Sequence, residues 1–371
     1  MSDANDDAVL PGSGTPLRDL PKISLHDHLD GGLRPQTIIE LGDAIGLELP
    51  ATDAAELGAW FTAQSDSGSL VEYLKTFDVT IAVMQTEEGL TRVAREFVED
   101  LHADGVVYGE IRWAPEQHLT RGLTLDQTVE AVQRGIDEAV DAVESGGGFL
   151  RAGQLVSSMR MTDRGREIAE LALRHRERGV VGFDIAGPEA GFPPSRMRDA
   201  FDLLAANWFP TTVHAGEADG LESIASALLD GRALRLGHGV RIAEDLTIIE
   251  TDDAYEVELG RLAQWVRDRG IALETSPSSN LQTGAVAAWG TDMSAHPFDM
   301  LYQLGFRVTV NTDNRLMSGT SLTRELGLLV DAFGYDATDV EAFQLNAAEA
   351  AFLPLDGREE LVERIGDGFD L

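Results

Sequence analysis

Cysteine is absent from the 371 residues of this chain, and only Lys22 and Lys75 are lysines. A chain without cysteine forms no disulfide bond and offers no thiolate to a metal ion. Any metal site must therefore be built from histidine, aspartate or glutamate side chains. The chain has eight histidines and 64 acidic residues from which such a site could be made.

Long apolar runs are also absent, and no stretch of about 20 residues is apolar enough to span a bilayer. The first residues, MSDANDDAVLPGSG, lack the basic segment and the apolar stretch of a secretory signal. We therefore expect a soluble cytoplasmic protein. Residues 1–20 are rich in glycine, proline and aspartate, which predicts a flexible tail before a single domain over residues 21–371.

Positive charge is scarce, since 29 basic residues face 64 acidic ones and the formal net charge is −35. Such a surface repels nucleic-acid phosphates and anionic membranes, so we expect neither as a partner. The excess also raises the hypothesis of a salt-rich host, because salt screens the repulsion between like charges. An acidic protein from an arginine-favouring genome is the alternative. No pattern indicates an oligomeric state or a partner protein.

Short apolar segments alternate with stretches of helical period along most of the chain. Eight segments are candidate strands: 23–28, 106–112, 151–157, 180–185, 209–214, 233–238, 271–275 and 306–311. Helices are predicted between them, for example over 126–144, 164–178, 220–230, 257–269 and 320–333. Eight strand-then-helix units predict an α/β fold of the (β/α)₈ TIM-barrel type, with extra helices at the C-terminus. An open doubly wound sheet is the alternative, but it calls for a glycine-rich phosphate loop after the first strand, and HDHLDGG is not one.

The first connection is the longest, with about seventy residues or more between the first two strands. It contains the helical patterns 35–46 and 70–83 and the glycine- and serine-containing stretch AQSDSGS. Long insertions at the C-terminal face of a barrel often form lids. We therefore predict a helical lid within about 35–100, in which residues 50–80 cap the substrate.

Polar side chains gather where the predicted strands end, which is where catalytic residues of parallel barrels lie. They are His26, His28, Asp30, Gly187, His214, Glu217, His238, Asp313 and Asn314. Four of the eight histidines are among them. The remaining histidines, His102, His118, His175 and His296, have no visible partners and are interpreted as surface or structural residues.

The pair His26 and His28 is the strongest indication of a metal. Strand residues two apart point to the same face, so both imidazoles reach the barrel mouth. An isolated H-x-H is most often an ordinary polar pair, but His214 and Asp313 end two other strands. Three imidazoles and a carboxylate suit Zn²⁺. Glu217 is then either a helix N-terminal charge or a proton donor beside the metal.

Five motifs occur in a characteristic order: HDHLDGG, DIAGPE, HAGE, LGHG and NTDN. Together with PSSNLQTGAV at residues 277–286, they closely resemble the adenosine deaminases of the metal-dependent amidohydrolase superfamily. The resemblance covers residues 20–355. It implies zinc-dependent hydrolytic deamination of adenosine, and of 2′-deoxyadenosine, to inosine and ammonia in purine salvage. The implied partner is a small-molecule purine nucleoside.

The resemblance also implies a role for each residue at the strand ends. One Zn²⁺ would be held by His26, His28, His214 and Asp313, with a water in the remaining position. His238 would act as a base and orient that water, and Glu217 would protonate purine N1. The ribose contact falls on Asp30, the backbone contact to N3 on Gly187 and the contact to N7 on Asn314.

Asn314 departs from the family pattern, which often has a second aspartate here, and Arg315 follows it. An amide NH₂ donates to N7 at any pH, whereas an aspartate donates only when protonated. The departure leaves open another 6-aminopurine substrate, such as adenine, an aminofutalosine or an adenine nucleotide. A nucleotide would need basic residues in the pocket.

Three further classes of protein are weighed against this resemblance. A binuclear phosphoesterase or lactonase commonly needs a lysine on the fourth strand, and VVGFDIAG has none. A non-catalytic relative should have lost Glu217, His238 or a ligand, and all are present. The cytidine-deaminase fold binds zinc through P-C-x-x-C and is excluded by the absence of cysteine.

Overall fold

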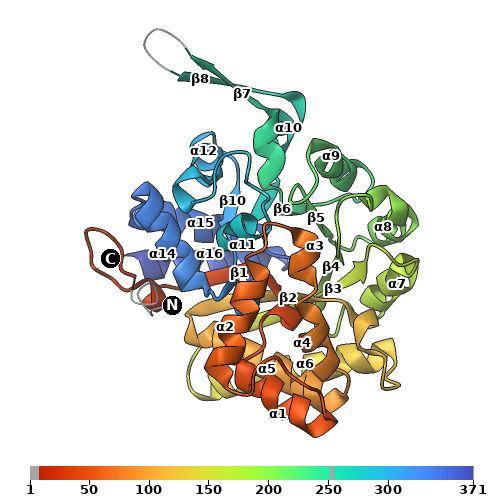
Figure 1. Ribbon diagram of the computed structural model, residues 1–371. Helices are drawn as coiled ribbons and strands as arrows, with labels where there is room; N and C mark the ends of the chain where they lie inside the picture. Colours follow the sequence, from red (N-terminus) through yellow and green to blue (C-terminus); the bar gives the residue numbers. More distant parts are fainter. Residues whose placement is uncertain (1–7, 251–254, 371) are drawn as a thin grey trace.

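A computed structural model of the protein describes residues 8–250 and 255–370; residues 1–7, 251–254 and 371 lie outside the description. Eight parallel strands form the centre of the molecule (Figure 1). They are β1 Lys22–His28, β2 Val106–Trp113, β3 Arg151–Met159, β4 Val180–Ala186, β5 Thr212–Ala215, β6 Arg235–His238, β9 Ala272–Thr275 and β10 Val308–Val310.

Hydrogen bonding orders the strands as two half-barrels, β1-β2-β3-β4 and β10-β9-β6-β5. Parallel bridges join the halves at Asp27–Asp313 and at Phe183–Thr211, so the barrel is closed. All eight predicted strands are present, although β5, β6 and β10 begin two or three residues later than predicted. The predicted (β/α)₈ barrel is therefore confirmed, and the open doubly wound sheet is wrong.

Helices surround the barrel, and each barrel strand is followed in the chain by one or more of them (Figure 1). The insertion after β1 holds α1 Pro35–Ile45, α2 Ala54–Ser65, α3 Leu70–Leu74, α4 Phe77–Val83 and α5 Glu87–Ala103. The outer helices are α6 Leu125–Ser145, α7 Gly165–His175, α8 Arg198–Ala206, α9 Leu221–Leu229 and α10 Arg261–Asp268. The later helices are α11 Pro277–Gln282, α12 Phe298–Gln303, α13 Arg315–Ser318, α14 Leu322–Phe333, α15 Ala337–Ala350 and α16 Leu355–Phe369. The expected C-terminal helices are therefore present as α15 and α16.

An antiparallel hairpin, β7 Leu246–Glu250 and β8 Tyr255–Leu259, projects from the barrel between β6 and α10 (Figure 1). The prediction of a helix from residue 257 is wrong, because residues 257–259 belong to β8 and the helix begins at Arg261. The alternation of acidic and apolar residues in EVEL suits a strand. The Asp245 carboxylate accepts the N–H groups of Leu262 and Ala263 at 3.0 and 2.9 Å, which fixes the start of α10.

The end of the expected N-terminal tail packs against the barrel. Leu10, Leu17 and Leu20 are buried, and the Lys22 ammonium group donates to the carbonyls of Leu17 and Leu20 at 2.7 and 2.9 Å. Residues 8–20 therefore pack in part on the barrel, because their leucines bury apolar surface despite the surrounding glycines and prolines. The proposed division at residue 20 stays a prediction, and residues 1–7 lie outside the described residues.

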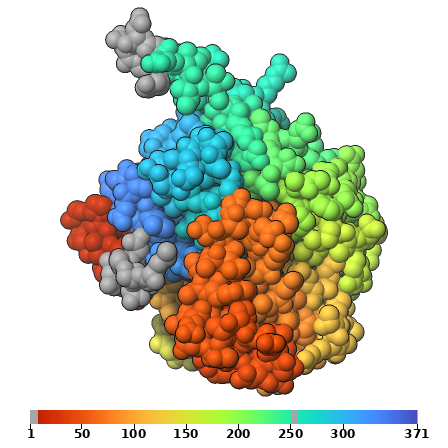
Figure 2. Space-filling model, in the orientation of Figure 1, coloured from red at the N-terminus to blue at the C-terminus, as the bar shows by residue number. Residues whose placement is uncertain are grey.

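The helices of the insertion after β1 cover one side of the barrel, where Figure 2 shows their orange and red atoms as a continuous surface. Helices α1 and α2 contact each other, and α4 contacts α1 and the turn after β1. Within the described residues, no helix is long and apolar enough to cross a membrane.

Candidate active site

The polar residues predicted at the strand ends lie together at one mouth of the barrel. A cavity of about 230 Å³ opens there. Its walls include His28, Asp30, Gly187, His214, Glu217, His238, Asp313 and Asn314. His26 lies deeper, fully buried beside Asp313. The structure therefore brings all nine predicted site residues together.

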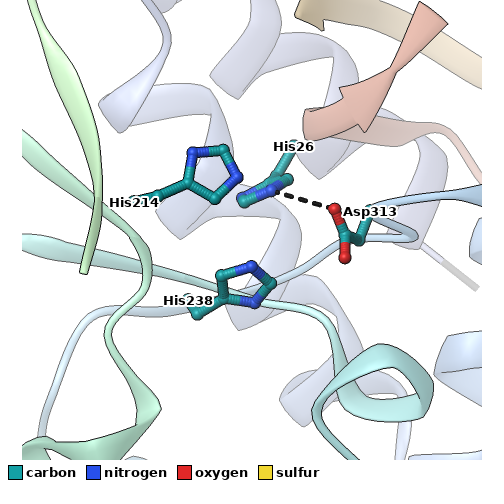
Figure 3. A group of neighbouring side chains, drawn as sticks. All are labelled: His26, His214, His238 and Asp313. Atoms are coloured by element: carbon teal, nitrogen blue, oxygen red, sulfur yellow. Dashed lines mark ion pairs between the residues drawn. The ribbon is translucent and has the colours of Figure 1, made fainter. Parts of the chain in front are cut away.

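Imidazoles and one carboxylate converge at the floor of this cavity (Figure 3). The Nε2 atoms of His26 and His28 each lie 3.3 Å from Asp313 Oδ1. His28 Nε2 is also 3.3 Å from His214 Nε2. Ring nitrogens and a carboxylate oxygen that lie this close to one another form a suitable binding site for a metal cation.

His238 belongs to the same cluster. Ligand atoms of His26, His214, His238 and Asp313 all lie within 4.8 Å of one another. By this measure alone, His238 takes the place in the metal site that was predicted for His28. Five groups thus converge, and distances do not by themselves select four ligands among them.

Barrel closure brings the two ends of this cluster together. His28 N donates to the carbonyl of Asp313 at 2.7 Å, and Asp313 N donates to the carbonyl of His26 at 2.9 Å. Asp313 and His238 both have left-handed backbone, with φ of 59° and 61°. Such a conformation costs a non-glycine residue about 1–3 kcal/mol and is characteristic of functional sites. It turns both side chains from the strand direction into the mouth.

Charge at the cluster is arranged for metal binding. Burial lowers the pKa of His28, His214 and His238, so these imidazoles are neutral at pH 7 and have lone pairs to share. Burial opposes ionisation of Asp313, but the surrounding histidines outweigh it and hold its pKa well below the usual range. Ser279 Oγ donates to the other oxygen of Asp313 at 2.6 Å.

Carboxylates in the barrel interior hold the far nitrogens of two rings. Glu274 Oε2 lies 3.2 Å from His26 Nδ1, and Asp184 Oδ2 lies 2.7 Å from His214 Nδ1. Such carboxylate–histidine pairs fix the ring tautomer and leave Nε2 free for a metal. Arg112 bridges the two carboxylates, at 2.9 Å to Asp184 and 2.7 Å to Glu274.

Sequence reasoning missed Arg112, Asp184 and Glu274 as part of the site. A signal was available, because each is a charged residue inside a predicted barrel strand. A charged group in a buried strand needs a partner, and three such groups on β2, β4 and β9 predict one shared network.

Glu217 lies opposite the cluster, with Oε2 3.6 Å from His238 Nε2. It is only 4% exposed. Burial raises its pKa well above the usual range, and the charges of Asp313 and Glu189 raise it further. The protonated form of this carboxyl group therefore persists to a higher pH than it does in a free glutamate.

Glu189 holds the turn that carries Glu217. Its carboxylate accepts the four successive backbone N–H groups of residues 216–219 at 2.7–3.1 Å, and the hydroxyl of Ser223 at 2.5 Å. A carboxylate satisfied by five donors is a rigid anchor. Glu189 stands two residues after Gly187 in the motif DIAGPE. Sequence reasoning quoted the motif without assigning this residue a role.

The predicted substrate contacts line the cavity wall. Burial raises the pKa of Asp30 to about 7. Gly187 has φ of 96°, and a Cβ there would come within 3.0 Å of the Met161 methyl group. The Asn314 side chain packs against Gly31, where a Cβ would overlap its amide group.

Among the helices of the insertion after β1, α3 and α4 line the cavity. Leu70, Tyr73 and Leu74 of α3 line it, with Phe77, Asp78 and Ile81 of α4. Residues 50–69 do not line it. The part of the predicted lid that faces the cavity is therefore residues 70–81.

Arg315 does not reach the cavity. Its Nε lies 2.8 Å from Asp27 Oδ2, and its guanidinium group stacks over the Phe97 ring at 4.0 Å. It lines a separate hollow instead. Among the described residues that line the active-site cavity, there is no lysine or arginine.

The remaining histidines differ in burial. His118, His175 and His296 are buried, and His102 is exposed. Their interpretation as structural or surface residues stays a prediction.

Comparison with known proteins places most of the chain in one family. The adenosine deaminase family profile matches residues 21–368. An adenosine deaminase of Mycobacterium ulcerans is 53% identical over 350 residues, which cover 94% of this chain and 95% of the relative.

Solved structures resemble the chain as well. Arabidopsis ADAL complexed with IMP has a TM-score of 0.78 and 26% identity, and the match covers 95% of this chain and 98% of that one. A zinc-bound amidohydrolase of Burkholderia ambifaria has a TM-score of 0.82 and 22% identity, covering 99% and 97%. The latter likeness concerns the fold alone. The family match and the identity to curated relatives show that this chain belongs to the adenosine deaminase family of C–N hydrolases.

Proposed function

We propose that the residues of the barrel mouth, with one zinc ion, carry out the hydrolytic deamination of adenosine to inosine and ammonia. The observation that carries the proposal is the pairing of two unlike groups across one cavity. A cluster of imidazoles with the ionised carboxylate of Asp313 faces Glu217, a buried carboxyl group whose raised pKa favours its protonated form. Two titratable groups whose environments push their pKa values apart are the usual mark of an acid–base site.

The donor set fits zinc. His26, His28, His214 and Asp313 would hold the ion, because their ring nitrogens and Asp313 Oδ1 converge at the floor of one cavity. Neutral imidazole nitrogen and carboxylate oxygen are ordinary zinc ligands. When bound, zinc lowers the pKa of a coordinated water to about 7 and so supplies a nucleophile at neutral pH.

The side chains around the cluster handle the protons. Glu217 donates a proton to purine N1, so that the negative charge created by attack of water at C6 is neutralised. His238, beside Glu217, orients the attacking water. Overall, water adds at C6 and the C6–N bond breaks. The proton given to N1 stays in inosine, one proton of the water leaves with the amino group as ammonia, and the other returns Glu217 to its acid form.

Recognition of a nucleoside falls to three further residues. The Asp30 carboxyl group binds the ribose, the Gly187 backbone N–H approaches N3, and the Asn314 amide donates to N7. None of these contacts requires the ribose 2′-hydroxyl group alone, so 2′-deoxyadenosine is a second substrate. The described residues that line the cavity include no lysine or arginine for a phosphate, which favours a neutral nucleoside over a nucleotide.

Another 6-aminopurine remains the second candidate, and Asn314 is the observation that favours it. Free adenine would leave the buried Asp30 without a ribose partner, and an unpaired buried polar group is costly. Adenosine is therefore the better substrate. A cytoplasmic location, expected from the sequence, stays a prediction.

The proposal is tested with purified protein by following the ultraviolet change from adenosine to inosine and by counting zinc per chain. We expect one zinc per chain and turnover that a chelator removes. His28→Ala should lose zinc, whereas His238→Ala should keep it and lose turnover. His102→Ala, at an exposed histidine, is the matched control.

Two outcomes would contradict parts of the proposal. Zinc retained by His28→Ala and lost by His238→Ala would reverse the assignment of those two residues. Zinc-loaded protein that acts on adenine but leaves adenosine unchanged would replace the substrate.

A further inference from the structure

Two buried residues outside the assigned site connect to His238 from behind. Asn280 lies on α11, and His296 precedes α12. Asn280 Nδ2 is 2.9 Å from His238 Nδ1, and Asn280 Oδ1 is 3.3 Å from His296 Nε2. Asn280 is fully buried and His296 is 3% exposed.

This chain of contacts ends on the backbone N–H group of Phe298. The backbone N–H of Phe298 lies 3.1 Å from His296 Nδ1, and a backbone N–H can only donate. His296 Nδ1 must therefore be the acceptor. Burial lowers the pKa of His296 to about 3, so the ring is neutral and carries its one proton on Nε2.

Each remaining contact then has a fixed direction. His296 Nε2–H donates to an oxygen, which assigns that atom of Asn280 as Oδ1. The other atom of the amide is the NH₂ group, and it donates to His238 Nδ1. Because a neutral imidazole has one proton, that of His238 stands on Nε2.

We propose that Asn280 and His296 are positioning residues that fix the tautomer of His238 and make its Nε2–H a hydrogen-bond donor toward the reacting groups. This inference rests on the proposed function of the site. His238 Nε2 faces Glu217 and the metal-binding cluster, as Figure 3 shows for the cluster.

The consequence concerns the chemical role of His238. The lone pair of this tautomer lies on Nδ1, where Asn280 already occupies it. Taking up a proton from water at Nε2 would need the opposite tautomer, with two donors facing each other at Nδ1. His238 therefore donates a hydrogen bond to the attacking oxygen, in place of the base role implied by the family resemblance.

The direct test is nitrogen NMR of the zinc-loaded enzyme labelled with ¹⁵N at histidine, with the His238 signals assigned by their loss in His238→Gln. We expect a protonated Nε2 and an unprotonated Nδ1. A protonated Nδ1 in the unmodified enzyme would overturn the proposal. The ring signals report the tautomer whether or not adenosine is turned over, so this result is independent of the proposed function.

Substitution of Asn280 by aspartate should reverse the direction of its hydrogen bond with His238. In Asn280→Asp the carboxylate accepts from both rings, which draws a proton onto His238 Nδ1. We expect the Nδ1 signal to become that of a protonated nitrogen, and kcat to fall at least about tenfold with a smaller change in KM. An unchanged Nδ1 signal would contradict the assigned directions.

A matched pair of variants separates positioning from packing at the end of the relay. His296→Gln keeps an acceptor for Phe298 N–H and a donor for Asn280, whereas His296→Phe keeps a ring but neither polar function. We expect the His296→Gln variant to retain most of kcat and the wild-type tautomer of His238. The His296→Phe variant should lose both. Equal kcat and equal His238 signals in the two folded variants would overturn the proposed hydrogen-bond chain from His296 through Asn280 to His238. If His296→Phe does not fold, Asn280→Asp decides.

Discussion

Two acidic residues at the barrel mouth, Glu217 and Asp313, are equally buried, yet their pKa values shift in opposite directions. Burial alone raises the pKa of both carboxyl groups. Histidines surround Asp313 and keep it ionised, whereas Glu217 is beside two other carboxylates, those of Asp313 and Glu189. The neighbours thus decide which residue binds a cation and which donates a proton.

Removing the titration of Glu217 tests this division. Glu217→Gln keeps the shape and an N–H donor but cannot transfer a proton, so we expect kcat to fall by about 10²–10⁴-fold. The measurement is kcat/KM across the pH range in the zinc-loaded enzyme. Because the pKa of Glu217 is raised, its acid form exists below that pKa and disappears as pH rises through it.

The alkaline limb of the wild-type profile should therefore be missing from the residual activity of Glu217→Gln. Zinc content should be the same in both proteins. A variant that retains wild-type activity, or one that keeps the alkaline limb, would contradict the assignment of Glu217 as the acid.

Asn314 is the second residue whose chemistry can be isolated. Asn314→Asp keeps a group that can donate to N7 when protonated, whereas Asn314→Leu has a similar volume and no donor. We expect measurable adenosine turnover in the first and a loss at least tenfold greater in the second. Equal kcat/KM values for the two variants would rule out the N7 contact.

Whole elements hold these residues at the required separations. The turn after β5 carries Glu217, and Glu189 anchors it with one carboxylate that accepts four backbone N–H groups. In Glu189→Gln an NH₂ group faces some of these donors. We expect the turn to lose about 1–3 kcal/mol of hydrogen bonding, with a lower thermal midpoint and at least tenfold lower kcat.

Glu222→Gln is the matched control, because Glu222 is an exposed acid on the neighbouring α9. Its thermal midpoint and kcat should match those of the unmodified protein. If Glu189→Gln behaves like this control, Glu189 does not position the turn.

The elements that sequence predicts best are those with strong periodicity. The eight barrel strands are mostly apolar, so they could be located. The nine site residues lie in or just after β1, β4, β5, β6 and β10, so they could be named. The hairpin of β7 and β8 was missed because its acidic–apolar alternation runs directly into the helix at Arg261. Register and contacts between distant strands are not encoded locally. The charges of Asp184 and Glu274 within their strands could therefore indicate a shared network, but not which histidines they contact.

At the scale of the whole molecule, a net charge of −35 acts on the folded state as self-repulsion. Exposed acidic residues three positions apart on one helix, Glu138, Asp141 and Glu144 of α6, are a local example. Like charges at this spacing destabilise a helix, and negative charge near its C-terminus opposes the helix dipole. Salt should relieve all of these repulsions.

We therefore expect the thermal midpoint to rise by several degrees as KCl increases from about 0.05 to about 1 M, where the Debye length falls to about 3 Å. The triple variant E138Q/D141N/E144Q should unfold at a higher temperature than the parent in low salt, and the difference should shrink in high salt. Surface ion pairs weaken over the same range, but each contributes only about 0–1 kcal/mol, so repulsion dominates at this net charge. A midpoint that falls with KCl would show that the ion pairs outweigh the repulsion. Activity that declines steadily above physiological salt would count against a salt-rich host, even if the midpoint rises.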